Sequence, residues 1–148
     1  ARGDANVTLA HAGVAFGVHR GRVVVHGAPP PAFEVRWRGE PELALPHGRL
    51  AFGRAVGAGL DAARADAAPV RVRLRIGGER LQLAAGRPKR ALKSLLQEAG
   101  LPPWERRGLP LVWCGDALAM VPGIGVDAAF AAPPGRPGIT VAWHPNPL

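Results

Sequence analysis

A strict alternation of apolar and basic residues over Val70–Ile76 constrains the fold more than any other stretch of the chain. Valine, leucine and isoleucine occupy every second position, and arginine fills the three positions between them: Arg71, Arg73 and Arg75. A period of two residues is typical of a β-strand with one face buried and the other exposed. We therefore predict a strand that packs its apolar face on a core and presents its arginines to solvent.

The three arginines also suggest a binding surface. Neighbours on one face of a strand stand about 6.6 Å apart, because each residue advances the chain by about 3.3 Å. Phosphate groups recur at a similar interval along a nucleic-acid strand, so three guanidinium groups could follow its backbone. A solvated strand face that binds nothing explains the same pattern, and the alternation alone does not decide between the two.

Positive charge is concentrated in the same part of the chain. The whole sequence has a formal net charge of +8, and residues 70–107 hold ten Lys or Arg against three acids, a net of +7. Gly77-Gly78 predicts a turn after the arginine strand, and Glu79–Leu83 a second strand. A helix is predicted over Lys89–Ala99, ended by Gly100 and two prolines. Eight of these ten basic residues therefore fall within one predicted strand–strand–helix unit.

The first turn of this predicted helix is unusually basic. Cations crowd the positive end of the helix dipole, where acidic side chains are usually favoured: Arg87, Lys89, Arg90 and Lys93. Free backbone N–H groups at the same end would join these cations in receiving an anion. A basic turn that is merely solvated is the alternative interpretation.

A series of motifs follows at a specific spacing between residues 75 and 127: Gly77-Gly78-Glu79-Arg80, Leu92-Lys93, Leu96-Gln97-Glu98, Pro102-Pro103-Trp104-Glu105-Arg106, Pro110-Leu111, Gly115-Asp116 and Gly123. This series resembles the C-terminal domain of bacterial tRNA(Ile)-lysidine synthetase. Val18–Val23 resembles the weaker strand motif that precedes this domain in the same family. Leu81-Gln82-Leu83 departs from the pattern, since many relatives carry a further arginine or aromatic residue there.

The resemblance implies a fold and a place in a larger enzyme. The fold is a β-rich α+β domain, a β-sandwich-like arrangement of mixed short strands with one main helix, Lys89–Ala99, shared with a module of phenylalanyl-tRNA synthetase. The family activates a cytidine of the tRNA anticodon with ATP and joins lysine to it. That chemistry resides in an N-terminal domain with a Ser-Gly-Gly-x-Asp-Ser pyrophosphate loop, and the loop motif is absent from this chain.

We therefore expect this chain to recognise tRNA without performing the reaction. ATP and Mg²⁺ belong to the catalytic domain, so no catalytic, cofactor-binding or metal-binding residue is expected here. The expected partners are tRNA(Ile), through its acceptor-stem side, and the N-terminal catalytic domain, in the cytoplasm and away from any membrane. A homodimer is left open. The alternative is an interdomain or subunit-interaction module that makes no direct contact with RNA.

The basic residues of the central stretch are the candidate tRNA contacts: Arg71, Arg73, Arg75, Arg80, Arg87, Lys89, Arg90, Lys93, Arg106 and Arg107. Trp104, which precedes two of them, is expected to pack the helix end rather than to contact RNA. Other chemistry-bearing residues are sparse, because the chain has no tyrosine, a single serine (Ser94) and five histidines without metal-ligand spacing. The only cysteine, Cys114, excludes an internal disulfide, and we expect it to be a structural thiol.

The rest of the chain is predicted to form short strands around a core: Val14–His19, Arg22–His26, Phe33–Trp37, Arg49–Arg54, Leu111–Cys114, Ala117–Val121 and Ile139–Trp143. Ala58–Asp66 is interpreted as either a short helix or a loop. We expect one structural domain over residues 1–148, with a strand-rich half (1–66) and a motif-bearing half (67–148). The chain begins at Ala1 and its only methionine is Met120, so we expect it to be part of a longer protein.

Overall fold

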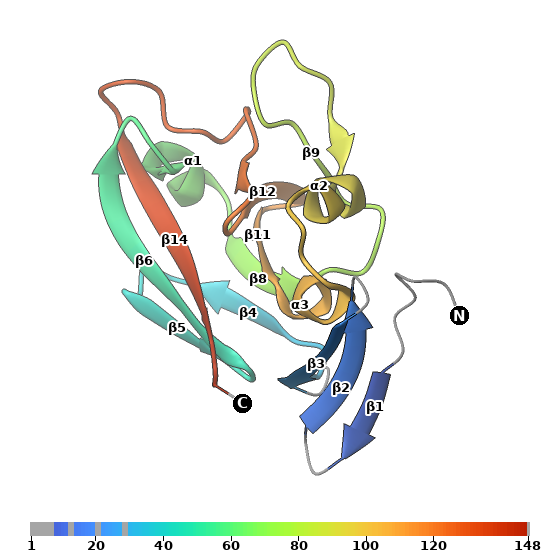
Figure 1. Ribbon diagram of the computed structural model, residues 1–148. Coiled ribbons are helices and arrows are strands. Elements are labelled where there is room, and N and C mark those ends of the chain that lie inside the picture. Colours follow the sequence, from blue (N-terminus) through green and yellow to red (C-terminus); the bar gives the residue numbers. More distant parts are fainter. Residues whose placement is uncertain (1–7, 12–13, 20–21, 28–29, 148) are drawn as a thin grey trace.

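The structure, a computed structural model, describes residues 8–11, 14–19, 22–27 and 30–147, with side chains from residue 30 onward. These residues form a strand-rich fold with short helices (Figure 1). The predicted fold class, a β-rich α+β domain, is therefore confirmed. No helix among the described residues is long and apolar enough to cross a membrane.

Three strands near the N-terminus form an antiparallel sheet of their own: β1 (Thr8–His11), β2 (Val14–His19) and β3 (Arg22–Gly27). β2 pairs with β3 from Val18↔Val23 to Val14↔Gly27. This pairing confirms the two strands that the sequence predicts here. The residues that join them, Arg20 and Gly21, lie outside the described part of the chain.

The arginine strand lies inside a five-stranded antiparallel sheet, the central sheet. Its strands, in spatial order, are β13 (Gly125–Val126), β12 (Ala117–Val121), β11 (Pro110–Cys114), β8 (Val70–Leu74) and β4 (Glu34–Trp37). β11 and β12 form a hairpin around Gly115, whose φ of 59° suits glycine. β8 is paired on both sides, with β11 and with β4, so its backbone is fixed by two neighbours.

A second sheet packs against one face of the central sheet. Its strands are ordered β5 (Glu42–Leu45), β6 (Gly48–Val56), β14 (Pro137–Pro145) and β7 (Leu60–Asp61). β6 and β14 pair along nine residues each. Buried side chains from both sheets, such as Leu50 and Ile139 against Val72 and Val112, form the first core. Apolar burial of this kind is the main force that holds the two sheets together.

The helices are α1 (Ala62–Ala67), α2 (Leu92–Glu98) and α3 (Pro103–Gly108). α2 buries Leu92, Leu95 and Leu96 in a second core that also contains Leu111 and, from β12, Leu118 and Val121. Leu111 is the cross-strand partner of Arg73 and so lies on the arginine face of the central sheet. This second core therefore covers part of the face that the sequence predicts to be open.

The predicted helix Lys89–Ala99 is wrong at its start. Residues 90–91 instead form a short strand, β10 (Arg90–Ala91), that pairs with β9 (Arg80–Leu81), and the helix begins only at Leu92. The N–H of Leu92 donates to the carbonyl oxygen of Glu79 at 2.9 Å, which ties the chain before the helix to the preceding strand. Helix propensity gives way here to backbone pairing with the neighbouring strand β9.

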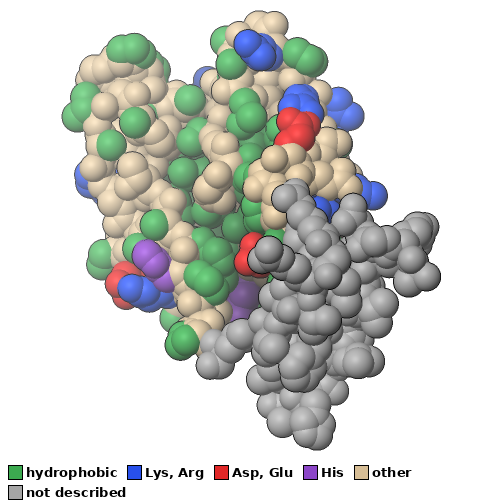
Figure 2. Space-filling model, in the orientation of Figure 1, with side chains coloured by type: hydrophobic (Ala, Val, Ile, Leu, Met, Phe, Trp, Pro, Cys, Tyr) green, Lys and Arg blue, Asp and Glu red, His purple; other side chains and the backbone are tan. Residues whose placement is uncertain are grey.

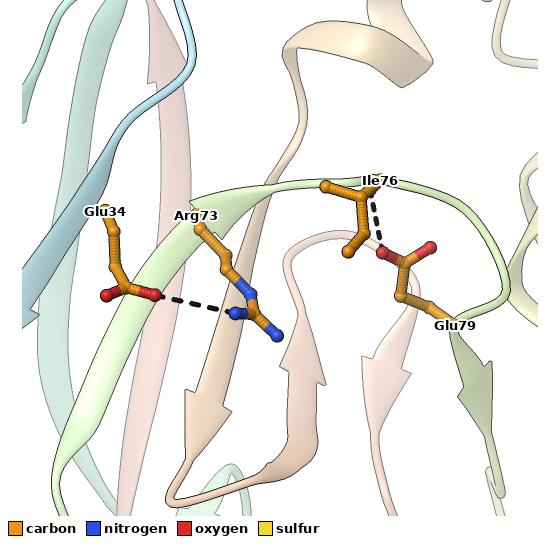
Figure 3. Close-up of polar contacts among 4 residues, drawn as sticks. All are labelled: Glu34, Arg73, Ile76 and Glu79. Carbon is orange, nitrogen blue, oxygen red and sulfur yellow. Dashed lines mark hydrogen bonds and ion pairs between the residues drawn. The ribbon is translucent and has the colours of Figure 1, made fainter.

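Two predicted strands are also shorter in the structure. β8 ends at Leu74 and β9 spans only Arg80–Leu81. Between them, the Glu79 carboxylate accepts from the backbone N–H of Ile76 at 2.8 Å (Figure 3) and from that of Gly77 at 2.9 Å. These two backbone N–H groups therefore bond to a side chain within a turn rather than to a neighbouring strand. The Ile76 side chain is 82% exposed. The sequence interpretation missed α3, β1, β5 and β13 altogether, and it left Ala58–Asp66, which contains β7 and most of α1, as either a short helix or a loop.

Candidate nucleic-acid interface

The alternation in β8 places its residues as predicted, but its arginines do not share one environment. Val70 and Val72 are buried, and Arg71 is exposed on the opposite face. Arg73 is only half-exposed, because its guanidinium lies 4.1 Å from the centre of the Trp113 ring. Its Nη1 also lies 3.5 Å from Glu34 Oε1 (Figure 3). Arg73 is thus held between an aromatic ring and a carboxylate.

The strand register explains this difference. Glu34 lies directly opposite Arg73 on β4, and Trp113 lies opposite Arg71 on β11, diagonal to Arg73. Arg75, just beyond the strand, is half-buried, and its Nη1 has no hydrogen-bond partner among the described residues. The expectation of three evenly exposed arginines is therefore wrong, and only Arg71 meets it.

The most exposed basic segment is the connection between β9 and β10. Every residue from Leu83 to Ala91 is exposed, and Figure 1 shows this loop projecting from the top of the molecule. We call residues 80–91 the basic hairpin. It contains no acidic residue and four cations: Arg80, Arg87, Lys89 and Arg90. Figure 2 shows blue Lys and Arg side chains along this edge of the molecule.

Side chains within the basic hairpin fix its backbone. Arg80 Nη2 donates to the carbonyl oxygen of Lys89 at 2.9 Å, and Gln82 Nε2 donates to that of Arg87 at 2.7 Å. The Gln82 backbone is anchored in turn, since its N–H donates to Asp127 Oδ2 at 3.0 Å. Gln82, where the sequence departs from the family pattern, thus supports the loop. Leu81 is fully buried and faces the second core.

Arg90 does not contribute to a basic helix start. Its guanidinium donates two hydrogen bonds to the Glu98 carboxylate at the end of α2, and this contact lowers the pKa of Glu98. Arg87 and Lys89 lie in the loop rather than on the helix, so only Lys93 belongs to the first turn. The predicted ring of four cations around a helix N-terminus is therefore wrong.

The two arginines of α3 also differ in environment. Arg106 is half-buried, and its Nε donates to the carbonyl oxygen of Leu101 at 2.6 Å, so it helps to hold the segment between α2 and α3. Arg107 is exposed and Trp104 is half-buried. Among the described residues, no ion-pair partner is found for six exposed candidates: Arg71, Arg80, Arg87, Lys89, Lys93 and Arg107.

The structure offers little for catalysis or metal binding. In the described ranges, no three His, Cys, Asp or Glu side chains are grouped so that they could hold a metal ion. Cys114 is buried, its Sγ donates to the carbonyl oxygen of Arg64 at 3.2 Å, and burial raises its pKa. A protonated, buried thiol is a poor nucleophile, which agrees with a structural role.

Sequence reasoning missed a second group of arginines: Arg36, Arg38 and Arg54. They lie in the half of the chain whose charges are nearly balanced, so no excess of charge marks them. Arg36 is on the edge strand β4 and Arg54 on β6 of the other sheet. The three line one pocket in the structure. Only the packing of the two sheets brings them together, and no local motif could have indicated it.

Comparison with known proteins gives consistent matches. A family model described as the TilS substrate C-terminal domain matches residues 70–143, half of the chain. The tRNA(Ile)-lysidine synthase of Nitrosomonas europaea is 44% identical over 135 residues, which cover 88% of this chain and 30% of that protein. The protein of the same name from Azoarcus sp. is 38% identical over 109 residues, or 74% of this chain and 24% of the relative.

The chain thus spans less than a third of the length of these relatives. A crystal structure of a TILS C-terminal domain also matches, with a TM-score of 0.62 and 24% sequence identity. The match covers 80% of this chain and 100% of that one. At this identity the structural match establishes the fold.

Proposed function

This chain belongs to the family of TilS substrate C-terminal domains, and we propose that it binds tRNA(Ile) as the C-terminal part of a tRNA(Ile)-lysidine synthetase. In that protein an N-terminal domain would use ATP and Mg²⁺ to join lysine to the wobble cytidine of the anticodon. The C-terminal domain would help to position the tRNA for that reaction. The names and the greater length of the curated relatives support this proposal.

The observation that carries the proposal is the basic hairpin. It projects from the fold without an acidic residue, and its carbonyl groups at Arg87 and Lys89 are bound from within by Gln82 and Arg80. The side chains of Arg87 and Lys89 are exposed, as is Lys93 on α2 beside the loop. Cations held on a fixed backbone can contact successive phosphate groups of an RNA strand. Each such contact favours binding because it releases a counterion from the RNA.

Such contacts would orient the tRNA without reading its sequence, since phosphate groups are the same at every position. Specific recognition of tRNA(Ile) would then depend on other parts of the full-length protein or on the shape of the RNA. In this proposal, the surface contributes affinity for tRNA and fixes the orientation of the tRNA. It does not select the base that is modified.

A second function is favoured by exposed apolar side chains on the same turns. Ile76 is 82% exposed and Leu83 44% exposed, and both flank the β9 segment. Exposed apolar side chains that form one contiguous patch mark sites where another protein domain docks. On this interpretation the cations would pair with acidic residues of the catalytic domain, and RNA would not touch them.

Salt dependence separates the two functions. We expect Lys89→Gln and Lys93→Gln each to weaken tRNA(Ile) binding and to reduce the magnitude of the log–log salt slope by about 0.7–0.9. The double variant should show the sum, and an unrelated tRNA should respond in the same way. The measurement is tRNA affinity at several salt concentrations, with Arg136→Gln as a control at an exposed cation on the loop before β14. Unchanged slopes in the lysine variants would favour the interdomain function.

A further inference from the structure

A pocket of about 560 Å³ opens between the two sheets, beside α1. Its walls come from the edge of the central sheet (β4 and the start of β8), from β6 and β14 of the second sheet, and from the end of α1. Trp37, Val70 and Ile139 give it an apolar base. None of the basic-hairpin residues lines it. The pocket is therefore separate from the surface that carries the proposed function.

The charge of the pocket lining is strongly positive. Three arginines border it: Arg36 on β4, Arg38 in the turn after β4, and Arg54 on β6. The register of β4 and β8 places Arg36 on the face of the central sheet that carries Arg71, opposite to Trp37 and Val70, so Arg36 lies at the rim of the pocket. Asp66 is the single acid in the lining, so the formal charge of the lining is +2, three positive against one negative. Among the described residues, none of the three arginines takes part in an ion pair.

The Glu40 carboxylate lies near the pocket but is not counted in the formal charge of its lining. Glu40 lies two residues beyond Arg38 and is outside the lining. Its Oε1 accepts a hydrogen bond from the backbone N–H of Arg38, so it closes the turn after β4. The carbonyl oxygen of Glu40 is also engaged, since it accepts from Trp37 Nε1 at 2.7 Å. Glu40 thus closes the turn that presents Arg38, and backbone hydrogen bonds together with the positive charge of Arg38 lower the pKa of Glu40.

We propose that this pocket binds the phosphate group of a nucleotide. Guanidinium groups donate paired N–H bonds that match phosphate oxygens. Arg38 and Arg54 border the pocket from the two sheets, and Arg36 lies at its rim. The volume falls within the range of about 300–1,000 Å³ for small-ligand sites, so the nucleoside attached to the phosphate also fits. The apolar base offers contact area to that nucleoside.

The same chemistry has two sources. One is a free mononucleotide, and the other is a nucleotide of an RNA strand bound to this chain. A bound RNA strand could reach the pocket, because Arg36 is the cross-strand partner of Arg71 on the outer face of the central sheet. RNA that contacts Arg71 could therefore place a phosphate at the rim of the pocket. Only this second source rests on the proposed function.

The test uses the 148-residue chain with ¹⁵N-labelled arginine and follows the Nε–Hε signals by NMR. Inorganic phosphate, AMP and a short single-stranded RNA are titrated separately at constant ionic strength. We expect saturable shifts of the Arg36, Arg38 and Arg54 signals. Arg38→Gln and Arg54→Gln should each weaken binding by about tenfold, as expected for a lost hydrogen bond to a charged group. Both side chains are exposed, and circular dichroism checks that the variants fold.

Arg49→Gln is the matched control, because Arg49 is also an exposed arginine on β6 but lies outside the pocket. Saturation by phosphate and AMP would identify a free nucleotide as the ligand, and saturation by RNA alone would identify a strand. The proposal is overturned if no probe saturates, or if Arg38→Gln and Arg54→Gln bind like Arg49→Gln. That failure would not alter the result expected for the Lys89 and Lys93 variants, because their salt dependence reports on a different surface. The proposed function is therefore tested independently.

Discussion

Arg71 and Arg73 occupy the same face of the same strand, yet their side chains make different contacts. Arg73 stacks on Trp113 and pairs with Glu34, whereas Arg71 is exposed. A cation over an aromatic ring contributes about 0.5–2 kcal/mol, and an ion pair of this exposure contributes about 0–1 kcal/mol. Arg73 therefore contributes to folding, and Arg71 remains available to a partner.

We expect Arg73→Gln to lower the free energy of unfolding by about 1–2 kcal/mol, because it loses both contacts. Arg71→Gln, its matched control two residues away, should change stability by less than about 0.5 kcal/mol. Urea denaturation of the parent and both variants measures the difference. Equal stability of the two variants would show that the contacts of Arg73 with Trp113 and Glu34 are energetically neutral.

The sequence could predict the direction of these side chains but not their neighbours. Alternation in Val70–Leu74 depends only on the chemistry of adjacent residues, and it correctly separates the buried valines from the arginines. Glu34 is 39 residues from Arg73 in the sequence. Contacts of that range depend on strand order and register, which no local pattern encodes.

At the scale of elements, the turn between β8 and β9 depends on one buried carboxylate. Glu79 is 7% exposed and accepts from the backbone N–H groups of both Ile76 and Gly77. Its carbonyl oxygen accepts from Leu92, so the same residue also sets where α2 begins. From the sequence, Glu79 counts only as one of three acids in the basic stretch and as the start of a strand. The structure shows that it joins strand, turn and helix.

Glu79→Ala should lower the free energy of unfolding by about 1–3 kcal/mol, because two backbone donors lose their acceptor. Glu79→Gln should cost less, since an amide oxygen can still accept one of the bonds. Urea denaturation gives the energies, and hydrogen exchange should show faster exchange at the Ile76 and Gly77 amides. Glu105→Ala, at an exposed acid on α3, serves as the control; if it costs as much as Glu79→Ala, the buried carboxylate has no special role.

The same element scale shows why the basic helix start could not be predicted. The residues from Lys89 to Ala99 have a helical pattern of leucines, and the pattern itself is correct from Leu92 onward. The difference arises in residues 90–91, which pair with β9, a strand only two residues long. A strand of two residues has no period to detect, so its effect on the next element is visible only in three dimensions.

At the scale of the whole molecule, the central sheet separates two cores. The first core lies against the second sheet, and the other lies under α2 on the opposite face of β11 and β12. Trp143 on β14 packs against both. The basic hairpin is attached to the second core through Leu81, while the arginine-lined pocket borders the first. The fold thus carries two positively charged sites on two separately packed layers.

This arrangement makes a testable claim about the chain in isolation. Mixed with tRNA(Ile), ATP, Mg²⁺ and lysine, it should form no lysidine, because its sequence lacks the Ser-Gly-Gly-x-Asp-Ser loop that would bind pyrophosphate. It should instead inhibit a full-length relative, such as the tRNA(Ile)-lysidine synthase of Nitrosomonas europaea, by sequestering the tRNA. Lysidine formation at several concentrations of chain and tRNA is the measurement.

Inhibition by sequestration has a distinct signature. It should be relieved when tRNA is raised above the concentration of the chain, and the Lys89→Gln, Lys93→Gln double variant should inhibit less because it binds RNA more weakly. A chain that instead docks on the catalytic part of the relative would inhibit at any tRNA concentration, and exposed Ile76 and Leu83 would then be the residues to substitute. Lysidine produced by the chain alone would contradict both its proposed role and its division of labour with a catalytic domain.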